Sequence, residues 1–142
     1  MEQILKEKLW NYIVHNNPEL MLGLQREYSV SKFLDEKLSG IQVLLETLQS
    51  KDTPSYIIEE TCLNTLTEDF KPSRFLFLRS LLEEEFEKEY ASFREAGILT
   101  YEVVNLITWC APIFENFGFT ADNEEDPLVR NAMIGQLADY LN

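Results

Sequence analysis

Apolar residues recur at steps of three and four along most of this chain, which is the period of an α-helix with one buried face. The clearest stripe comprises Val30, Phe33, Leu34, Leu38, Ile41, Leu44, Leu45 and Leu48. No segment of about four to eight residues alternates between apolar and polar side chains, as a half-buried β-strand would. The pattern therefore predicts an all-α protein.

Residues that begin and end helices divide this pattern into seven predicted helices. They span about residues 3–15, 18–28, 30–48, 54–66, 74–96, 101–117 and 127–141. The predicted N-caps, whose side chains can accept a hydrogen bond from free N–H groups, are Asn17, Ser29 or Ser31, Thr53, Ser73, Thr100 and Asp126. Proline follows three of them, at the first helical position where its missing N–H costs nothing. Gly97 and Gly118 are the expected residues after two helix ends, while Gly23 weakens the second helix.

The predicted helices are joined mostly by brief turns, and the sequence contains no internal repeat or low-complexity linker. We therefore expect one domain of six or seven packed helices over residues 1–142. The segment from Tyr101 to Phe117 is apolar nearly all round, which predicts that it is the central helix. Pro112 is expected to kink this helix, because its ring meets the carbonyl of Thr108 and removes one hydrogen bond.

The net charge of the chain excludes some classes of binding partner. The formal net charge is −13, from 25 acidic and 12 basic residues. This negative field repels nucleic-acid phosphates and anionic membrane surfaces, so we expect no direct nucleic-acid or membrane binding. From Glu95 onward eight acidic residues stand against one basic residue, Arg130. A basic protein partner would be drawn to this part of the chain first, although solubility alone also explains an acidic surface.

The N-terminal residues and the cysteines favour a cytoplasmic location. The first eight residues mix charges of both signs and lack the apolar segment of a secretory signal. No apolar run approaches the roughly 20 residues of a membrane span. Cys62 and Cys110 lie far apart and form no C-x-x-C pair, so we expect both to be buried on helix faces rather than to bind metal.

The residue types needed for catalysis or metal binding are scarce. His15 is the only histidine, which leaves a catalytic triad without a base unless His15 serves, and its place at a helix end favours a surface role. No nucleotide-binding or hydrolase motif occurs. We therefore expect no enzyme activity, no cofactor and no metal. The alternative is an enzyme that uses Glu102 and Glu115 as general acid and base in a pocket near Trp109.

Two acidic runs are the remaining candidates for function. The run from Glu83 to Glu89 lacks the Glu-x-x-His pairs of a di-iron bundle, and the run from Asp122 to Asp126 lacks the spacing and glycine of a calcium loop. Both are typical of solvated surface. Trp10 is added because it lies on a terminal helix and because tryptophan is enriched at binding hot spots. The candidate partner contacts are Trp10, Glu83, Glu84, Glu87, Asp122, Glu124 and Glu125.

Several short motifs resemble one family across nearly the whole chain. They are Asn17-Pro18-Glu19-Leu20, Phe33-Leu34-Asp35, Phe70-x-Pro72-Ser73-Arg74-Phe75, Leu82-x-x-Glu85-Phe86, Cys110-Ala111-Pro112-Ile113-Phe114, Phe119-Thr120-x-Asp122 and Leu137-x-x-Tyr140-Leu141. They are similar to a family of small acidic helical bacterial proteins defined only as a domain of unknown function, often encoded by anaerobic gut bacteria near conjugative elements. Residues 87–105 depart from that pattern. The resemblance implies a helical fold and an intracellular setting, and it implies no activity.

These observations favour a non-enzymatic interaction or regulatory module whose acidic surface meets a protein partner. If the resemblance to proteins near mobile elements is sound, one specific form is a phosphate mimic that occupies the basic groove of a nucleic-acid-handling protein. A further alternative is a structural subunit of a homo-oligomer, which would present a flat apolar patch.

Overall fold

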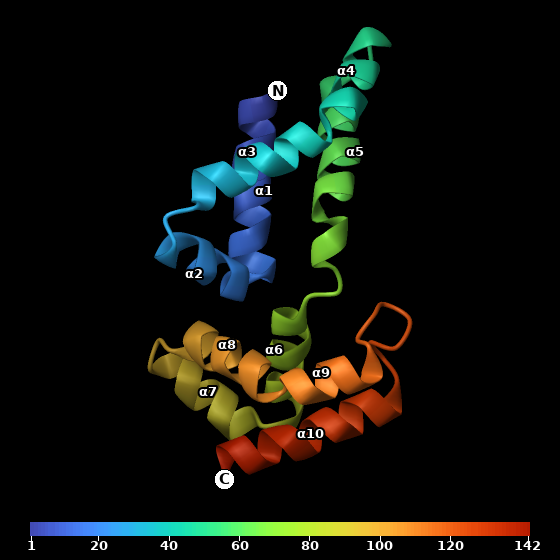
Figure 1. Cartoon of the computed structure of the whole chain (residues 1–142). Coiled ribbons are helices and arrows are strands. Elements are labelled where there is room, and N and C mark those ends of the chain that lie inside the picture. The colour runs from blue at the N-terminus through green and yellow to red at the C-terminus, as the bar shows by residue number, and fades with distance from the viewer. The chain divides into compact units, whose positions relative to one another are not determined.

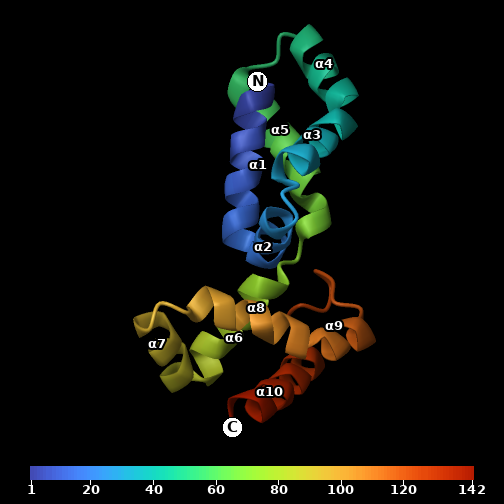
Figure 2. The ribbon, with the colours of Figure 1, turned by 60° about the vertical axis from the view of Figure 1, so that its left-hand side comes forward.

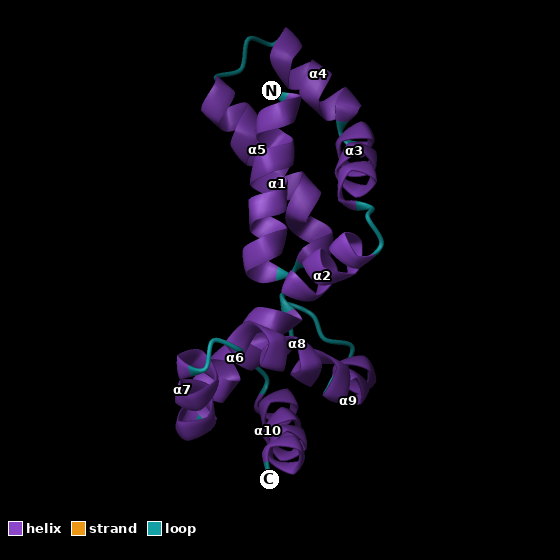
Figure 3. Cartoon of the chain, turned by 90° about the vertical axis from the view of Figure 1, so that its left-hand side faces the viewer, coloured by secondary structure: helices purple, strands orange, loops and turns teal.

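The computed structural model describes residues 1–142 and contains helices without strands, so the predicted all-α class is confirmed (Figures 1 and 3). Ten α-helices form, rather than six or seven: α1 (Glu2–Asn16), α2 (Pro18–Arg26), α3 (Val30–Gly40), α4 (Gln42–Ser50), α5 (Ser55–Thr67), α6 (Arg74–Glu85), α7 (Glu87–Glu95), α8 (Leu99–Trp109), α9 (Ala111–Phe117) and α10 (Pro127–Leu141). A short 3₁₀ helix, Glu68–Phe70, follows α5. The chain divides into two compact units, unit 1 (Met1–Phe70) and unit 2 (Lys71–Asn142).

The higher number arises because three predicted helices are each divided in two. The stripe over residues 30–48 breaks at Ile41, directly after Gly40, whose backbone freedom makes it a poor helix residue. The segment from Tyr101 to Phe117 breaks at Cys110 instead of only kinking at Pro112. Pro112 then lies in the first turn of α9, where a missing N–H leaves no hydrogen bond unmade.

The third break, at Phe86, lies inside the run of glutamates at residues 83–89. One continuous helix would stack the glutamates of residues 83–89 at spacings of three and four, where like charges destabilise the helix. The break places Glu87 and Glu89 in the first turn of α7, where carboxylates interact favourably with the helix dipole. Phe86 adopts φ −133° and ψ 55° and remains partly buried against the core of unit 2.

Two predicted N-caps and both predicted glycine ends are confirmed by the structure. Ser73 Oγ accepts a hydrogen bond from Leu76 N–H at 3.0 Å, and Asp126 Oδ1 accepts one from Leu128 N–H at 2.9 Å. Gly97 and Gly118 adopt left-handed conformations with φ 76° and φ 58°. After each glycine, the next residue closes a Schellman motif: Ile98 N–H donates to Phe93 O, and Phe119 N–H donates to Phe114 O.

The predicted caps at Thr53 and Thr100 are wrong, because Pro54 and Ile98 occupy the N-cap positions of α5 and α8. Pro54 has extended geometry, with φ −55° and ψ 141°, so it precedes the helix instead of opening it. Asn17 and Ser29 stand at the predicted cap positions, yet neither side chain caps the helix. Asn17 Nδ2 donates instead to Phe70 O at 3.4 Å.

Unit 1 has its own core, in which α1 packs against α5 and α3 (Figure 2). Its fully or nearly buried members are Leu5, Leu9, Ile13, Leu34, Leu38, Ile41, Leu45, Ile58, Cys62 and Leu66. The stripe predicted over residues 30–48 supplies several of them from α3 and α4. None comes from residues 101–117, so the expectation that this segment organises the whole chain is wrong for unit 1.

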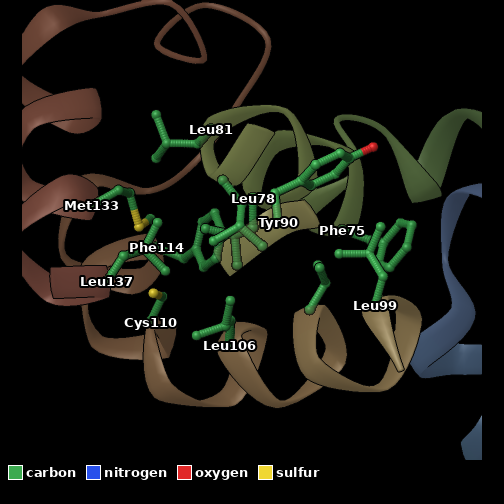
Figure 4. Packing of buried hydrophobic residues seen from close by; sticks show 12 residues of the cluster. Phe75, Leu78, Leu81, Tyr90, Leu99, Leu106, Cys110, Phe114, Met133 and Leu137 are labelled. Carbon is green, nitrogen blue, oxygen red and sulfur yellow. The ribbon is translucent and has the colours of Figure 1, made fainter. Parts of the chain in front are cut away.

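In unit 2 the predicted central segment does lie at the centre. Val103, Leu106, Cys110 and Phe114 are completely buried, and α6, α7, α9 and α10 supply the side chains around them. Figure 4 shows this cluster at close range, with Phe114 and Leu106 among its labelled members. The expectation of one domain over residues 1–142 stays a prediction.

Candidate functional site

A hollow of about 280 Å³ in unit 2 collects acidic side chains over an apolar floor. Its lining residues, which define the acidic hollow, are Leu76, Phe77, Ser80, Leu81 and Glu84 of α6, Glu124 and Glu125 of the loop before α10, and Arg130 of α10. The five α6 positions share one face because they recur at steps of one, three and four residues. Helix periodicity therefore places Glu84, on the acidic rim, on the same face of α6 as the apolar floor.

The loop that supplies Glu124 and Glu125 is held by the side chain of Asn123. Asn123 Oδ1 accepts a hydrogen bond from Thr120 N–H at 2.8 Å, and Asn123 Nδ2 donates to Phe117 O at 2.8 Å. At its far end the loop passes into Asp126, which caps α10. Both ends are thus anchored, so the two rim carboxylates are presented from a fixed backbone.

The floor of the hollow is fixed by aromatic packing. The ring of Phe77 lies 4.9 Å from that of Phe119 and 6.0 Å from that of Phe114, both in edge-to-face arrangements. Phe114 is fully buried, so this trio connects the floor to the core of unit 2. Leu76 remains 40% exposed beside it. An exposed apolar side chain next to carboxylates gives the hollow both an apolar and a charged wall.

Arg130 bridges α10 to the end of α6. Its Nη2 donates to Glu85 Oε1 at 2.7 Å and to Glu84 Oε2 at 2.9 Å. These hydrogen bonds, that to Glu85 first and that to Glu84 second, raise the pKa of Arg130, so it is a permanent cation. Three carboxylates against one guanidinium still leave the acidic hollow negative. Because the pair is partly exposed, its contribution to stability is small.

The structure brings together only some of the predicted contact residues. Glu84, Glu124 and Glu125 share the acidic hollow although they come from different acidic runs. Glu83, Glu87 and Asp122 are exposed and do not line it. Sequence reasoning missed the floor residues and the role of Arg130, although the isolation of this one cation among eight acidic residues was a usable signal.

Trp10 lies in unit 1, in a second hollow of about 320 Å³ between α1 and α3. Gln3, Lys6, Glu7 and Trp10 form one wall, and Val30, Ser31, Leu34 and Asp35 form the other; these residues define the Trp10 hollow. An ion pair between Lys6 and Asp35 joins the two walls.

The alternative catalytic pair does not share either hollow. Glu102 of α8 is half-buried and accepts a hydrogen bond from Tyr140 Oη at 3.4 Å, whereas Glu115 of α9 is exposed. Burial raises the pKa of Tyr140, and the Glu102 carboxylate adds to this effect. Trp109 Nε1 donates to Gln136 O at 2.8 Å, and Gln136 Nε2 donates to Trp109 O at 2.9 Å. This reciprocal pair joins α8 to α10.

The remaining candidate groups are the cysteines and His15. No group of three or more His, Cys, Asp or Glu side chains is arranged to hold a metal ion. Cys62 and Cys110 are unpaired and buried, and burial raises the pKa of Cys110 to about 12. His15 Nδ1 donates to Asn11 O at 2.7 Å at the end of α1. No helix has both the length and the apolar character needed to cross a membrane.

Comparison with known proteins finds no match: no family model fits the chain, and no curated protein and no solved structure is significantly similar to it. The family resemblance carried by the short motifs therefore stays a prediction.

Proposed function

We propose that this protein is a non-enzymatic interaction module that recognises a basic protein partner through the acidic hollow. The observation that carries the proposal is the combination, in one hollow of about 280 Å³, of three carboxylates with an apolar floor. This combination matches a lysine or arginine side chain, which has an aliphatic stem and a charged end.

Each wall of the acidic hollow matches one part of such a side chain. The methylene stem of a partner's basic side chain would lie on Leu76 and Phe77, which removes apolar surface from water. Its charged head would meet Glu124 and Glu125, which have no cation of their own within ion-pair distance. Hydrogen bonds between ionised groups are stronger than those between neutral groups, so both walls favour the same type of side chain.

The net charge of −13 supports the same class of partner. A field of this sign speeds the encounter with a basic protein and slows the encounter with nucleic acid. A cytoplasmic setting fits the two unpaired, buried cysteines. Phosphate mimicry is a specific form of the proposal, in which exposed Glu83, Glu87 and Asp122 of unit 2 extend the acidic surface.

The test is an NMR titration of the ¹⁵N-labelled protein with N-acetyl-arginine amide, with the uncharged isostere N-acetyl-citrulline amide as comparison. We expect saturable shifts of the backbone amides of Ser80, Glu124 and Glu125 with the arginine compound alone. Raising NaCl from about 50 to about 500 mM should weaken binding, because the attraction is partly between exposed charges.

Two variants with the same change in charge locate the effect. Glu84→Gln/Glu124→Gln/Glu125→Gln neutralises the three carboxylates that form the rim of the acidic hollow. Glu27→Gln/Glu60→Gln/Glu95→Gln neutralises three exposed carboxylates that lie outside both hollows. Losing the rim should weaken binding by about 10-fold or more, a difference of roughly 1.4 kcal/mol. Equal losses in the two variants would mean that the long-range field, and not the hollow, attracts cations.

A further inference from the structure

The Trp10 hollow in unit 1 has walls that are fixed by the core beneath it. On α1, Gln3, Lys6, Glu7 and Trp10 recur at steps of three and four, so they share one face. The adjacent face of this helix contributes Leu5, Leu9 and Ile13, all completely buried. Leu34 of α3 is nearly buried and belongs to the same cluster. The hollow therefore exists before any ligand arrives, and binding requires little reorganisation.

The charges of the hollow do not cancel. Lys6 is neutralised by its ion pair with Asp35, and neighbouring Lys8 is held by Glu59 at 2.6 Å. The only hydrogen bond to the Glu7 carboxylate comes from the neutral amide of Gln3, at a long 3.4 Å. Glu7 is thus a carboxylate without a cation, on the rim of a hollow of about 320 Å³.

Trp10 differs from several aromatic rings of the chain that each have a cation over one face. Lys37 lies over Phe70, Arg74 over Phe114, and Arg79 and Arg94 over Tyr90. The ring of Trp10 is half-buried, borders the hollow and has no cation over it. Because tryptophan gives the most favourable cation–π interaction, an unused indole beside an unneutralised carboxylate has the chemistry of a cation site.

We infer that the Trp10 hollow is a second recognition site, specific for the arginine side chain of a protein partner. The planar guanidinium stacks on the Trp10 indole and donates hydrogen bonds to Glu7, while the aliphatic stem contacts Val30 and Leu34. Arginine suits the site better than lysine, because guanidinium is planar and more weakly hydrated than ammonium. This inference does not rest on the proposed function of the acidic hollow, since no residue is common to the two hollows.

The experiment follows the indole N–H signals of the full-length protein by NMR. The chain has two tryptophans, and the variant Trp109→Phe assigns their signals. Titration with N-acetyl-arginine amide should shift the Trp10 signal saturably, and N-acetyl-citrulline amide should leave it in place. N-acetyl-lysine amide should bind several-fold more weakly.

Matched variants separate this site from general charge and from the acidic hollow. Glu7→Gln should weaken the arginine-dependent shift by about fivefold or more. Glu2→Gln, the same change at an exposed position of α1 outside the hollow, should leave it unchanged within about twofold. Glu84→Gln/Glu124→Gln/Glu125→Gln should also leave the Trp10 response intact, so either site can fail without the other.

Four outcomes overturn the inference. The first is no saturable Trp10 shift with arginine, and the second is an equal shift with citrulline. The third is an equal effect of Glu7→Gln and Glu2→Gln, which would show that Glu7 has no local role. An equal affinity for the lysine compound overturns the assignment to guanidinium. Circular dichroism of each variant verifies that its helices are intact.

Discussion

At the scale of single residues, Arg130 has two roles that oppose each other. It joins α10 to α6 through Glu84 and Glu85, and it also places a positive charge inside the acidic hollow. A partner's basic side chain would compete with this internal cation for the same carboxylates. We therefore expect Arg130 to lower the affinity of the acidic hollow for a partner's cation.

The variant Arg130→Gln tests both roles. We expect the free energy of unfolding to fall by only about 0.2–1 kcal/mol, because the lost ion pair is partly exposed. Binding of N-acetyl-arginine amide at the hollow should become severalfold tighter, since Glu84 no longer faces an internal cation. Urea unfolding and the NMR titration measure the two effects. Lys51→Gln, an exposed position in unit 1, is the control for the change in net charge. Weaker binding in Arg130→Gln would contradict the competition.

Cys110 makes stability depend on pH in the alkaline range. Burial raises its pKa from 9.0 to about 12, so the folded state holds its proton where the unfolded state releases it. The contribution of the protonated thiol to the free energy of unfolding is fully present below pH 9 and declines as the pH rises toward about 12.

We therefore expect Cys110→Ala to flatten the fall in unfolding free energy between about pH 9 and 10 relative to the parent protein, because the tyrosines that also titrate there are common to both proteins. The substitution also lowers the free energy of unfolding itself, because removal of the sulfur leaves a cavity in the core. The slope is thus the informative quantity, measured by urea unfolding at each pH. An unchanged slope in Cys110→Ala would exclude the thiol as its source.

At the scale of helices, local chemistry predicted some helix ends and missed others, and periodicity missed the breaks within helices. The caps at Ser73 and Asp126 and the ends at Gly97 and Gly118 were predictable, because each requires one residue type at one position. The break at Phe86 could not be read from periodicity, because apolar positions recur at helical spacing on both sides of it. Only the repulsion among its neighbouring glutamates pointed there.

Two glycines of unit 2 provide a matched test of these local rules. Gly97 has φ 76°, which an L-residue adopts at a cost, whereas Gly135 lies inside α10 with nothing within 4 Å of an added Cβ. Gly97→Ala should destabilise unit 2 by about 1 kcal/mol. Gly135→Ala should stabilise it by roughly 0.5–1 kcal/mol, because alanine loses less backbone entropy in a helix. Urea unfolding of the two variants should give opposite signs, and a stabilising Gly97→Ala would refute the assignment of Gly97 as a left-handed helix end.

At the scale of the whole molecule, the sequence predicted the carboxylates of the candidate site but not how the fold brings them together. The carboxylates were visible in the sequence as two acidic runs, and the structure unites Glu84 with Glu124 and Glu125 around Arg130. Their meeting depends on how α6 packs beside the loop before α10, which no local pattern encodes. The Trp10 hollow likewise needs α1 beside α3, whereas Trp10 alone was visible as a candidate.

Two separate cores make the domain organisation testable. The core of unit 1 draws only on residues up to Leu66, and that of unit 2 only on residues from Phe75 onward. We therefore expect fragments 1–70 and 71–142 each to retain helical circular dichroism and to unfold cooperatively. Each should be less stable than a larger domain, because short chains bury a smaller fraction of their surface.

The fragments also divide the two proposed sites. Fragment 1–70 should keep the Trp10 response to the arginine compound, and fragment 71–142 should keep the amide shifts at the acidic hollow. Fragments that are unfolded alone and become helical on mixing would instead support one domain over residues 1–142, as the short turns of the sequence predict. Circular dichroism of the separate and mixed fragments at equal concentration distinguishes the two results, because only mutual folding makes the signal of the mixture exceed the sum of its parts.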